Sequence, residues 1–412
     1  MLLPLTEVIM VQFRQQDHAH WYHETQRSGN PEIYAAPVTD EHYSANGCNS
    51  DNLLNSDKIV ERDIFLLGLA DTIPAGLDGP LRQHAAIISA SDAMYQALFP
   101  LTVELDRDNT FSLYDRLSSA LTVAQVTGVQ RLCSHYATRL TPLSSPDASR
   151  ESNMRLTQIT QYARQLASQP TLIDKHALQQ LADVGLTDAD IIVLSQIIGF
   201  VGYQARVVAA LSALAGYPTV ILPGFPRMED APAGLIAPSV VQWQGWLPSK
   251  ATHGVISPEP SADEAEITLS ALLQYHQQSL IAYSSIITRQ HRPQQPDWLA
   301  LVALVTARIN GSRYCLAINK HQLQQVSHNA LLIEALELGI ENALATQSDD
   351  PTTHPLIYAV AELTRAPERF SHQHISPLLA LGVSNQQIVR IIFDTAAAGW
   401  TNRLRQTLGQ AV

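Results

Sequence analysis

The sequence predicts an all-α protein built from two tandem helical domains that arose by internal duplication. From Lys58 onward, apolar residues recur at three- and four-residue spacing, which is typical of amphipathic helices. Prolines crowd residues 217–261 and interrupt that periodicity, because proline disrupts the interior of a helix. Glycine, proline and capping residues of the first helical block recur in the second block at constant spacing, which indicates a repeat.

Breaks in the periodicity divide the first block into successive helices. The predicted helices span residues 63–70, 79–99, 113–126, 131–140, 154–169, 175–184, 187–199 and 203–214. The most apolar part, residues 191–215, contains Gln196, Gln204 and Arg206. Polar side chains at this frequency favour a helix buried in a protein core over one that faces lipid.

Composition divides the 412 residues into four parts. The predicted parts are a polar, loosely ordered arm (1–56), a first helical domain (57–216), a proline-rich linker (217–261) and a second helical domain (262–412). We expect the linker to wrap on the surface, with Trp243 and Trp246 as its docking points.

Pairs of similar residues support the duplication. At an offset of 197 residues, the segment 167–170 matches 364–367, and both end in proline. The same offset relates Gly185 to Gly382, Gly202 to Gly399, and Arg206 to Arg403. Upstream, residues 124–128 match 307–311 at the shorter offset of 183, so a loop inside the second copy is expected to be longer.

Composition also excludes several classes of function. The net charge is −12 and no run of Lys and Arg occurs, which argues against partners such as nucleic acid or an anionic membrane. Three scattered cysteines do not make a secreted disulfide framework, and the first residues lack the basic start of a signal peptide. We therefore expect a cytoplasmic protein. The sequence contains no phosphate loop, dinucleotide fingerprint or zinc motif, and we expect neither a cofactor nor a metal.

One segment has the features of a reactive cysteine site. Asn310 and Gly311 are residues that end a helix, and Ser312 is a good N-cap for the next one. Cys315 then falls in the first turn, where the positive end of the helix dipole and the charge of Arg313 favour a thiolate. The alternatives are that Cys315 is buried and inert, and that Ser312 is a plain cap.

The segment 297–317 resembles the carboxymuconolactone decarboxylase/AhpD-like superfamily, through the helix 297–305 and the redox turn 310–317. Residues 363–367 and 402–404 resemble later segments of that family, and the first block resembles the same fold through residues 186–191 and 203–206. The resemblance implies an all-α fold that forms homo-oligomers, and thiol peroxidase chemistry. In that chemistry the second cysteine of Cys-x-x-Cys attacks the peroxide and the first resolves the sulfenic acid, while a Glu and a His relay the proton.

The chain departs from this pattern at three of the four family positions. Ser312 replaces the resolving cysteine, Ala300 the glutamate and Asn319 the histidine, and only the attacking Cys315 is kept. His321, two residues beyond the family position, is either a substitute base or a solvent-facing side chain.

Two further residues need an interpretation. In the first copy, Cys133 has Gln130 and Ala137 at the partner positions, so we expect it to be structural. Asp394 lies in an apolar helix and must be paired or functional. Arg390, four residues earlier, is the expected partner, and the alternative is that Asp394 lines a cavity beside Cys315.

The sequence therefore predicts a peroxidase-related oxidoreductase. Cys315 would be its lone peroxidatic thiol, with Ser312 and His321 as the neighbouring candidates. Its partners would be a small hydroperoxide and a thiol reductant, and further copies of the chain would complete a homo-oligomer. The alternative is a catalytically degenerate protein that binds a small molecule or another protein. Decarboxylation of a muconolactone-type substrate is a third possibility, with no acid–base residues assigned to it.

Overall fold

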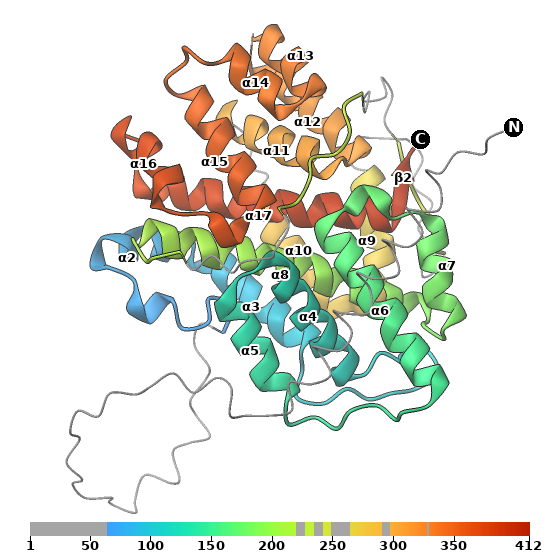
Figure 1. Cartoon of the computed structure of the whole chain (residues 1–412). Helices are drawn as coiled ribbons and strands as arrows, with labels where there is room; N and C mark the ends of the chain where they lie inside the picture. The colour runs from blue at the N-terminus through green and yellow to red at the C-terminus, as the bar shows by residue number, and fades with distance from the viewer. Residues whose placement is uncertain (1–63, 220–226, 235–241, 249–263, 291–296, 328) are drawn as a thin grey trace, which may run out of the picture. The chain divides into compact units, whose positions relative to one another are not determined.

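The computed structural model describes residues 64–219, 227–234, 242–248, 264–290, 297–327 and 329–412. The chain divides into two compact units, Met1–Val60 and Glu61–Val412, and all described residues belong to the second unit. The predicted arm, residues 1–56, lies outside the described residues. Helix makes up 72 % of the structure, so the all-α prediction is confirmed (Figure 1).

Helices of the first block begin and end close to the predicted positions. They are α2 (Asp78–Gln83), α3 (Ala85–Leu98), α4 (Leu113–Thr127), α5 (Gln130–Leu140), α6 (Arg150–Ser168), α7 (Lys175–Asp183) and α8 (Asp188–Leu214), with short 3-10 turns η3 (Ala70–Thr72), η4 (Ala75–Leu77) and η5 (Pro170–Leu172). Caps explain the starts: Ser112 and Thr187 each form a reciprocal capping box with the acid three residues later.

Three predicted boundaries in this block are wrong. Of the predicted helix 63–70, residues 64–68 form turns instead of a helix, and Leu67 has a left-handed φ of 57°. Residues 79–99 form two helices that meet at His84. Residues 187–214, predicted as two helices, form the single helix α8 with Thr187 as its N-cap, and the helix continues through Gly202 without a break.

The second block is helical from residue 264. It contains α9 (Glu264–Leu273), α10 (Gln277–Gln290), α11 (Asp297–Asn310), α12 (Arg313–Val326), α13 (Ala330–Leu338), α14 (Ile340–Thr346), α15 (Thr353–Arg365), α16 (His372–Ala380) and α17 (Asn385–Thr407), with 3-10 turns η6 (Gln274–His276) and η7 (Pro367–Arg369).

One small sheet was not predicted. Strand β1 (Trp243–Gly245) comes from the linker and pairs antiparallel with β2 (Gly409–Ala411) after α17. Trp243 is 5 % exposed and its indole N–H donates to the carbonyl of Arg405 at 2.8 Å, which confirms it as a docking point. Gly409 is required here, since a Cβ on it would lie 2.3 Å from the carbonyl oxygen of Gln244.

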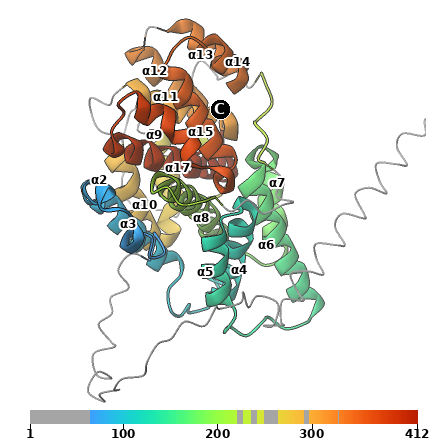
Figure 2. The same ribbon diagram turned by 60° about the vertical axis from the view of Figure 1, so that its left-hand side comes forward.

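Helices α8 and α17 pack against each other in the middle of the unit, and the other helices cover them (Figures 1 and 2). The two helices approach most closely where Gly199 of α8 meets Trp400 of α17. A Cβ on Gly199 would lie 2.0 Å from the indole Cδ1, so no larger residue fits without a shift. Phe200 and Tyr203 complete an aromatic cluster around Trp400, with ring centroids 5.7 and 5.6 Å away.

Helix α8 is buried along nearly its whole length. Its length and mean hydropathy would suffice to cross a membrane, yet its most apolar window is completely buried inside the protein. The prediction of a core helix is therefore confirmed. Its polar residues are also inside: the Gln204 amide donates to the carbonyl of Phe65 at 2.7 Å and accepts from the Tyr136 hydroxyl at 2.6 Å.

Element boundaries in the two blocks recur at the sequence offsets. Helices α7 and α16 begin and end 197 residues apart, and so do η5 and η7 and the starts of α8 and α17. Helices α4 and α11 end 183 residues apart, each followed by a glycine with positive φ (Gly128, 67°; Gly311, 74°). Internal duplication remains a prediction that these boundaries agree with.

Two buried arginines link the blocks reciprocally. Arg206 of α8 donates to the carbonyl of Thr364 at the end of α15, at 2.6 Å. Its counterpart Arg403 of α17 donates to the carbonyl of Ala167 at the end of α6, at 2.9 Å. Thr364 and Ala167 are themselves related by the 197-residue offset. Each arginine therefore stabilises the carbonyl end of a helix in the opposite block, where a cation is favoured.

Candidate functional site

The turn between α11 and α12 has the predicted geometry. Gly311 takes a left-handed φ of 74°, and its N–H donates to the carbonyl of Ala307 at 2.8 Å, which ends α11. Ser312 has extended backbone angles, α12 begins at Arg313, and Cys315 lies in the first turn. The thiol is therefore close to the positive end of the helix dipole. Cys315 is only 7 % exposed and belongs to the hydrophobic core.

Ser312 differs from its prediction as a side-chain cap. It occupies the N-cap position, but its hydroxyl makes no capping hydrogen bond. The residue is 1 % exposed, and its Oγ has no hydrogen-bond partner among the described residues. Asn310 Oδ1, two residues earlier, is also buried without a described partner. An orphan polar atom inside a protein is destabilising unless water or a ligand satisfies it, so this turn has unused hydrogen-bonding capacity.

His321 lies on the surface side of α12. Its ring is exposed, and its Nε2 is 2.9 Å from the amide nitrogen of Gln325, one turn further along the helix. The structure thus places His321 in solvent, as the alternative interpretation held, and does not bring it to Cys315. Asn319, at the family's histidine position, donates to the carbonyl of Ala303 at 3.1 Å and so ties α12 to α11.

An aromatic–cation stack beside Cys315 was missed by sequence reasoning. The guanidinium of Arg405 lies 4.8 Å from the ring centroid of Tyr314 and 5.0 Å from that of Trp243. This stack joins the first turn of α12 to α17 and to the linker strand β1. No sequence signal could have found it, because its three residues come from three distant segments.

Cys133 has the surroundings of a structural cysteine. It is half-buried in α5, and burial raises the pKa of its thiol to about 11, so the thiolate is disfavoured. Its neighbour His135 forms a hydrogen bond between its Nε2 and the Tyr95 hydroxyl at 2.6 Å, and Arg139 donates to the same hydroxyl at 2.5 Å. Burial and the charge of Arg139 lower the pKa of His135 to about 4, so the ring is neutral at pH 7.

Asp394 is paired, as the structural interpretation predicted. Its Oδ2 accepts a hydrogen bond from the Arg390 Nε at 2.6 Å, whereas its Oδ1 is buried and has no partner among the described residues. Burial raises the pKa of the carboxyl to about 7, and the nearby Arg390 opposes this shift. Asp394 lies near Tyr203 of α8, whose phenol pKa is raised by burial and by this carboxylate.

Because its pKa is raised in the folded protein, Asp394 should make the free energy of unfolding depend on pH, and replacing it with asparagine should remove this dependence. Between pH of about 4 and 7 the folded protein retains a proton that the unfolded chain has lost, so stability falls as pH rises. Relative to Asp394→Asn, the wild type should lose up to about 1.4 kcal/mol of unfolding free energy per pH unit across this range. Urea unfolding of both proteins at pH 5, 6, 7 and 8 measures the difference. The exposed Asp349→Asn serves as control, and a difference that does not vary with pH would contradict the assignment.

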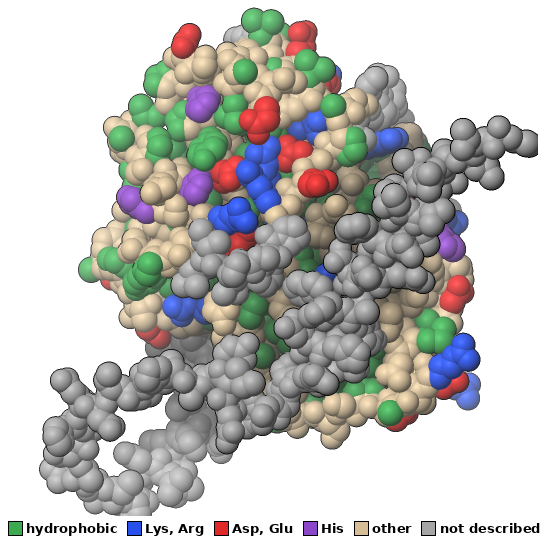
Figure 3. All heavy atoms as spheres, viewed as in Figure 1, with side chains coloured by type: hydrophobic (Ala, Val, Ile, Leu, Met, Phe, Trp, Pro, Cys, Tyr) green, Lys and Arg blue, Asp and Glu red, His purple; other side chains and the backbone are tan. Residues whose placement is uncertain are grey.

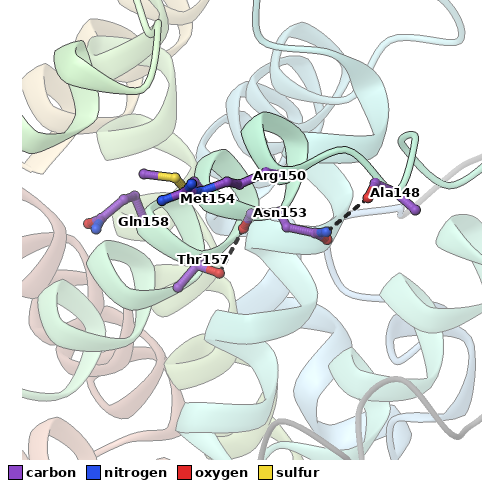
Figure 4. Close-up of a pocket in the computed structure, with 6 residues that line it drawn as sticks. All are labelled: Ala148, Arg150, Asn153, Met154, Thr157 and Gln158. Atoms are coloured by element: carbon purple, nitrogen blue, oxygen red, sulfur yellow. Dashed lines mark hydrogen bonds between the residues drawn. The ribbon is translucent and has the colours of Figure 1, made fainter.

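A surface hollow lies apart from the cysteine turn. It has a volume of about 460 Å³ and is lined by the N-terminal part of α6 and by Ala148 in the loop before it (Figure 4). Its lining residues are Ala148, Arg150, Asn153, Met154, Thr157 and Gln158. Because a single helix face lines it, the hollow lacks the converging walls of a substrate site.

The described residues offer no metal site, and the sequence matches no known family. Within the described parts of the chain, no three His, Cys, Asp or Glu side chains come together as a metal site would require. The histidines at positions 18, 20 and 23 lie outside those parts. No protein family profile matches the sequence, and no curated protein is significantly similar to it. The resemblance to the AhpD-like superfamily therefore rests on the motifs alone.

Proposed function

We propose that this chain is a thiol peroxidase of the AhpD-like type, with Cys315 as its lone peroxidatic residue. The observation that carries the proposal is the placement of Cys315 in the first turn of α12, three residues after Ser312, whose buried hydroxyl has no hydrogen-bond partner among the described residues. A helix N-terminus favours the thiolate, and a hydroxyl with no other partner is available to hydrogen-bond a peroxide oxygen. Arg313, exposed at the same turn, adds a positive charge.

The reaction would need only the peroxide and an external thiol. The Cys315 thiolate attacks one oxygen of ROOH, the O–O bond breaks, and the leaving alkoxide takes a proton to become ROH. The resulting sulfenic acid condenses with one thiol to release water and form a mixed disulfide. A second thiol then displaces Cys315 and leaves as the external disulfide. No second cysteine of the chain takes part, in keeping with serine at position 312.

The two-domain organisation is part of the same proposal. The recurring element boundaries and the reciprocal Arg206 and Arg403 contacts support two tandem AhpD-like copies, of which the second retains the cysteine site. A homo-oligomer in the cytoplasm, where small thiols are abundant, completes it.

A degenerate binding or assembly protein is the second candidate. The exposed position of His321 and the burial of Cys315 favour it, because His321, the base expected from the sequence, lies on the surface side of α12. Loss of such a base would remove a rate factor of about 10² to 10⁴.

Mass spectrometry after mild oxidation separates the two candidates. We expect dilute peroxide, followed by a sulfenic-acid probe, to label the Cys315 peptide of the native full-length protein. Labelling should persist in Cys133→Ser and vanish in Cys315→Ser, and peroxide should be consumed catalytically when a small thiol is supplied. If native Cys315 stays reduced while denatured protein is labelled, the peroxidase proposal fails.

A further inference from the structure

The core contains an unbroken series of packed aromatic side chains. Tyr95 of α3 contacts Phe200 of α8, with ring centroids 6.5 Å apart. Phe200 lies 5.7 Å from Trp400 of α17, which in turn lies 5.0 Å from Tyr283 of α10. Tyr203 of α8 lies 6.2 Å from Phe200 and 5.6 Å from Trp400. These five residues form the aromatic series, and each of them is at most 1 % exposed.

The aromatic series is closed to molecules in solution but not to electrons. On the face shown in Figure 3, hydrophobic side chains appear as scattered groups among polar ones, whereas the rings of the series are buried beneath the surface. Among aromatic side chains, tyrosine and tryptophan lose an electron most readily, and electrons tunnel between them through a packed ring such as Phe200. An oxidised phenol or indole is a strong acid, so it persists only where a neighbouring base takes its proton. The partner of each ring therefore determines where an oxidised state settles.

Three rings of the series have no base as a described partner. The hydroxyl of Tyr203 bonds to that of Ser91 at 2.9 Å, and the hydroxyl of Tyr283 bonds to that of Thr401 at 3.0 Å. The Nε1 of Trp400 is buried and has no hydrogen-bond partner among the described residues. A serine or threonine hydroxyl takes up no proton at neutral pH, so an oxidised state at these rings is transient.

Tyr95 differs, because its hydroxyl contacts an imidazole. The phenol oxygen lies 2.6 Å from His135 Nε2 and accepts a hydrogen bond from Arg139 Nη1 at 2.5 Å. Arg139 also donates to the carbonyl of Phe99 at 3.2 Å, which fixes the guanidinium. The lowered pKa of His135 keeps its ring neutral at pH 7, so one ring nitrogen is free to accept a proton. Because Arg139 already donates to the phenol oxygen, the tautomer with an unprotonated Nε2 allows the phenol O–H to donate to His135.

We propose that the aromatic series is an electron relay that ends at Tyr95. A one-electron oxidant at the surface, such as a peroxyl radical, takes an electron from the series and, with a proton from water, becomes a hydroperoxide. Electrons then move from ring to ring until Tyr95 is the donor. Its phenolic proton passes to His135 Nε2, which leaves a neutral Tyr95 radical beside an imidazolium. The transfer is favourable even to this weak base, because the oxidised phenol is the stronger acid.

A small reductant completes the cycle. One electron from a reductant such as ascorbate reduces the Tyr95 radical, and His135 returns the proton to the phenol oxygen. The half-buried positions of His135 and Arg139 place this end of the series close to solvent. No cysteine takes part, so the relay is independent of the proposed peroxidase.

Flash-quench oxidation of the native full-length protein tests the relay. Light and a cobalt(III) ammine convert tris(bipyridine)ruthenium(II) to the ruthenium(III) oxidant, and transient absorption and freeze-quench EPR follow the radicals formed on the protein. We expect a long-lived tyrosyl radical in the wild type and its loss in Tyr95→Phe, because phenylalanine is not oxidised. His135→Gln should shorten the lifetime of the radical, since an amide keeps a hydrogen bond to the phenol but takes up no proton.

Tyr162→Phe is the matched control. Tyr162 is also buried, its hydroxyl bonds to that of Ser195 at 2.9 Å, and among the described residues it forms no ring contact with the series. It should keep the wild-type yield and lifetime of the radical. Near-ultraviolet circular dichroism checks that each variant is folded, and if Tyr95→Phe is not, His135→Gln decides the matter.

Three results would overturn the relay. They are an unchanged long-lived radical in folded Tyr95→Phe, an equal loss of that radical in Tyr162→Phe, and a wild-type lifetime in His135→Gln. The result says nothing about Cys315, because all of these variants retain the thiol. A peroxidase that fails the sulfenic-acid experiment therefore leaves the relay standing, and the reverse also holds.

Discussion

Replacing Arg403 with methionine is expected to lower the free energy of unfolding by about 2–5 kcal/mol. Arg403 donates to the carbonyls of Leu166 at 3.2 Å and Ala167 at 2.9 Å, both in the opposite block. Leu166 cannot be served by its own helix, because the residue four positions later is Pro170, which has no N–H. Methionine would leave two buried carbonyls unsatisfied, each at about 1–3 kcal/mol.

Removing the buried charge of Arg403 should by itself stabilise the protein, so it offsets part of the loss caused by Arg403→Met. Burial and the nearby Arg206 lower the pKa of Arg403 well below its usual range, so the cation is itself destabilising in this position. We still expect a net loss, because the hydrogen bonds also hold the two blocks together.

Matched variants make the Arg403 prediction specific. Arg206→Met should lower stability less, because Arg206 Nε is buried without a described partner and fewer contacts are lost. The exposed Arg107→Met should change it by less than about 0.5 kcal/mol. Guanidinium chloride titrations followed by circular dichroism give all three values. An Arg403→Met protein as stable as Arg107→Met would show that the reciprocal contacts contribute nothing.

Alanine at position 199 is expected to destabilise the protein by about 3 kcal/mol, although alanine favours helix more than glycine does. The new Cβ would lie 2.0 Å from Trp400 Cδ1 and 2.5 Å from its Nε1, so α8 and α17 would have to separate. Because the two helices form the centre of the unit, the displacement cannot be confined to one side chain. Thermal and urea unfolding of Gly199→Ala measure the loss.

Gly202, one turn further along α8, provides the control. A Cβ there would meet only the Arg206 guanidinium, at 3.4 Å, so Gly202→Ala should be neutral or slightly stabilising. Shortening the partner tests the cause: in a Trp400→Leu background, Gly199→Ala should cost at least about 1 kcal/mol less than in the wild type. Equal costs in both backgrounds would show that the indole is not what excludes a side chain at position 199.

Local signals in the sequence predicted most helix ends correctly. The caps Ser112 and Thr187 start their helices by hydrogen bonds within four residues, so the chain itself carries the information. Gly311 likewise ends α11 by its own backbone conformation. Where a helix continued through a glycine, as α8 does at Gly202, the prediction was wrong because packing outweighs local propensity.

Features made by distant residues could not be predicted in this way. Strand β1 forms because residues 409–411, after α17, pair with it. The sequence near Trp243 contains no signal for this distant partner. Ser312 was correctly predicted at the N-cap position, but its buried hydroxyl makes no capping hydrogen bond. Tyr314, the residue before Cys315, stacks with Arg405 of α17, and Arg405 also stacks with Trp243 of the linker, so the sequence located the thiol without predicting these contacts next to it.

The burial of α8 has a consequence for synthesis on the ribosome. This helix is apolar enough to enter a bilayer, and α17, its main covering partner, is translated only after more than 150 further residues. At about 5–20 residues per second, α8 waits on the order of 10–40 s for that cover. Over this interval the nascent chain exposes the hydrophobic surface of α8. The yield of the protein in a cell should therefore depend on chaperones that shield hydrophobic segments until translation ends.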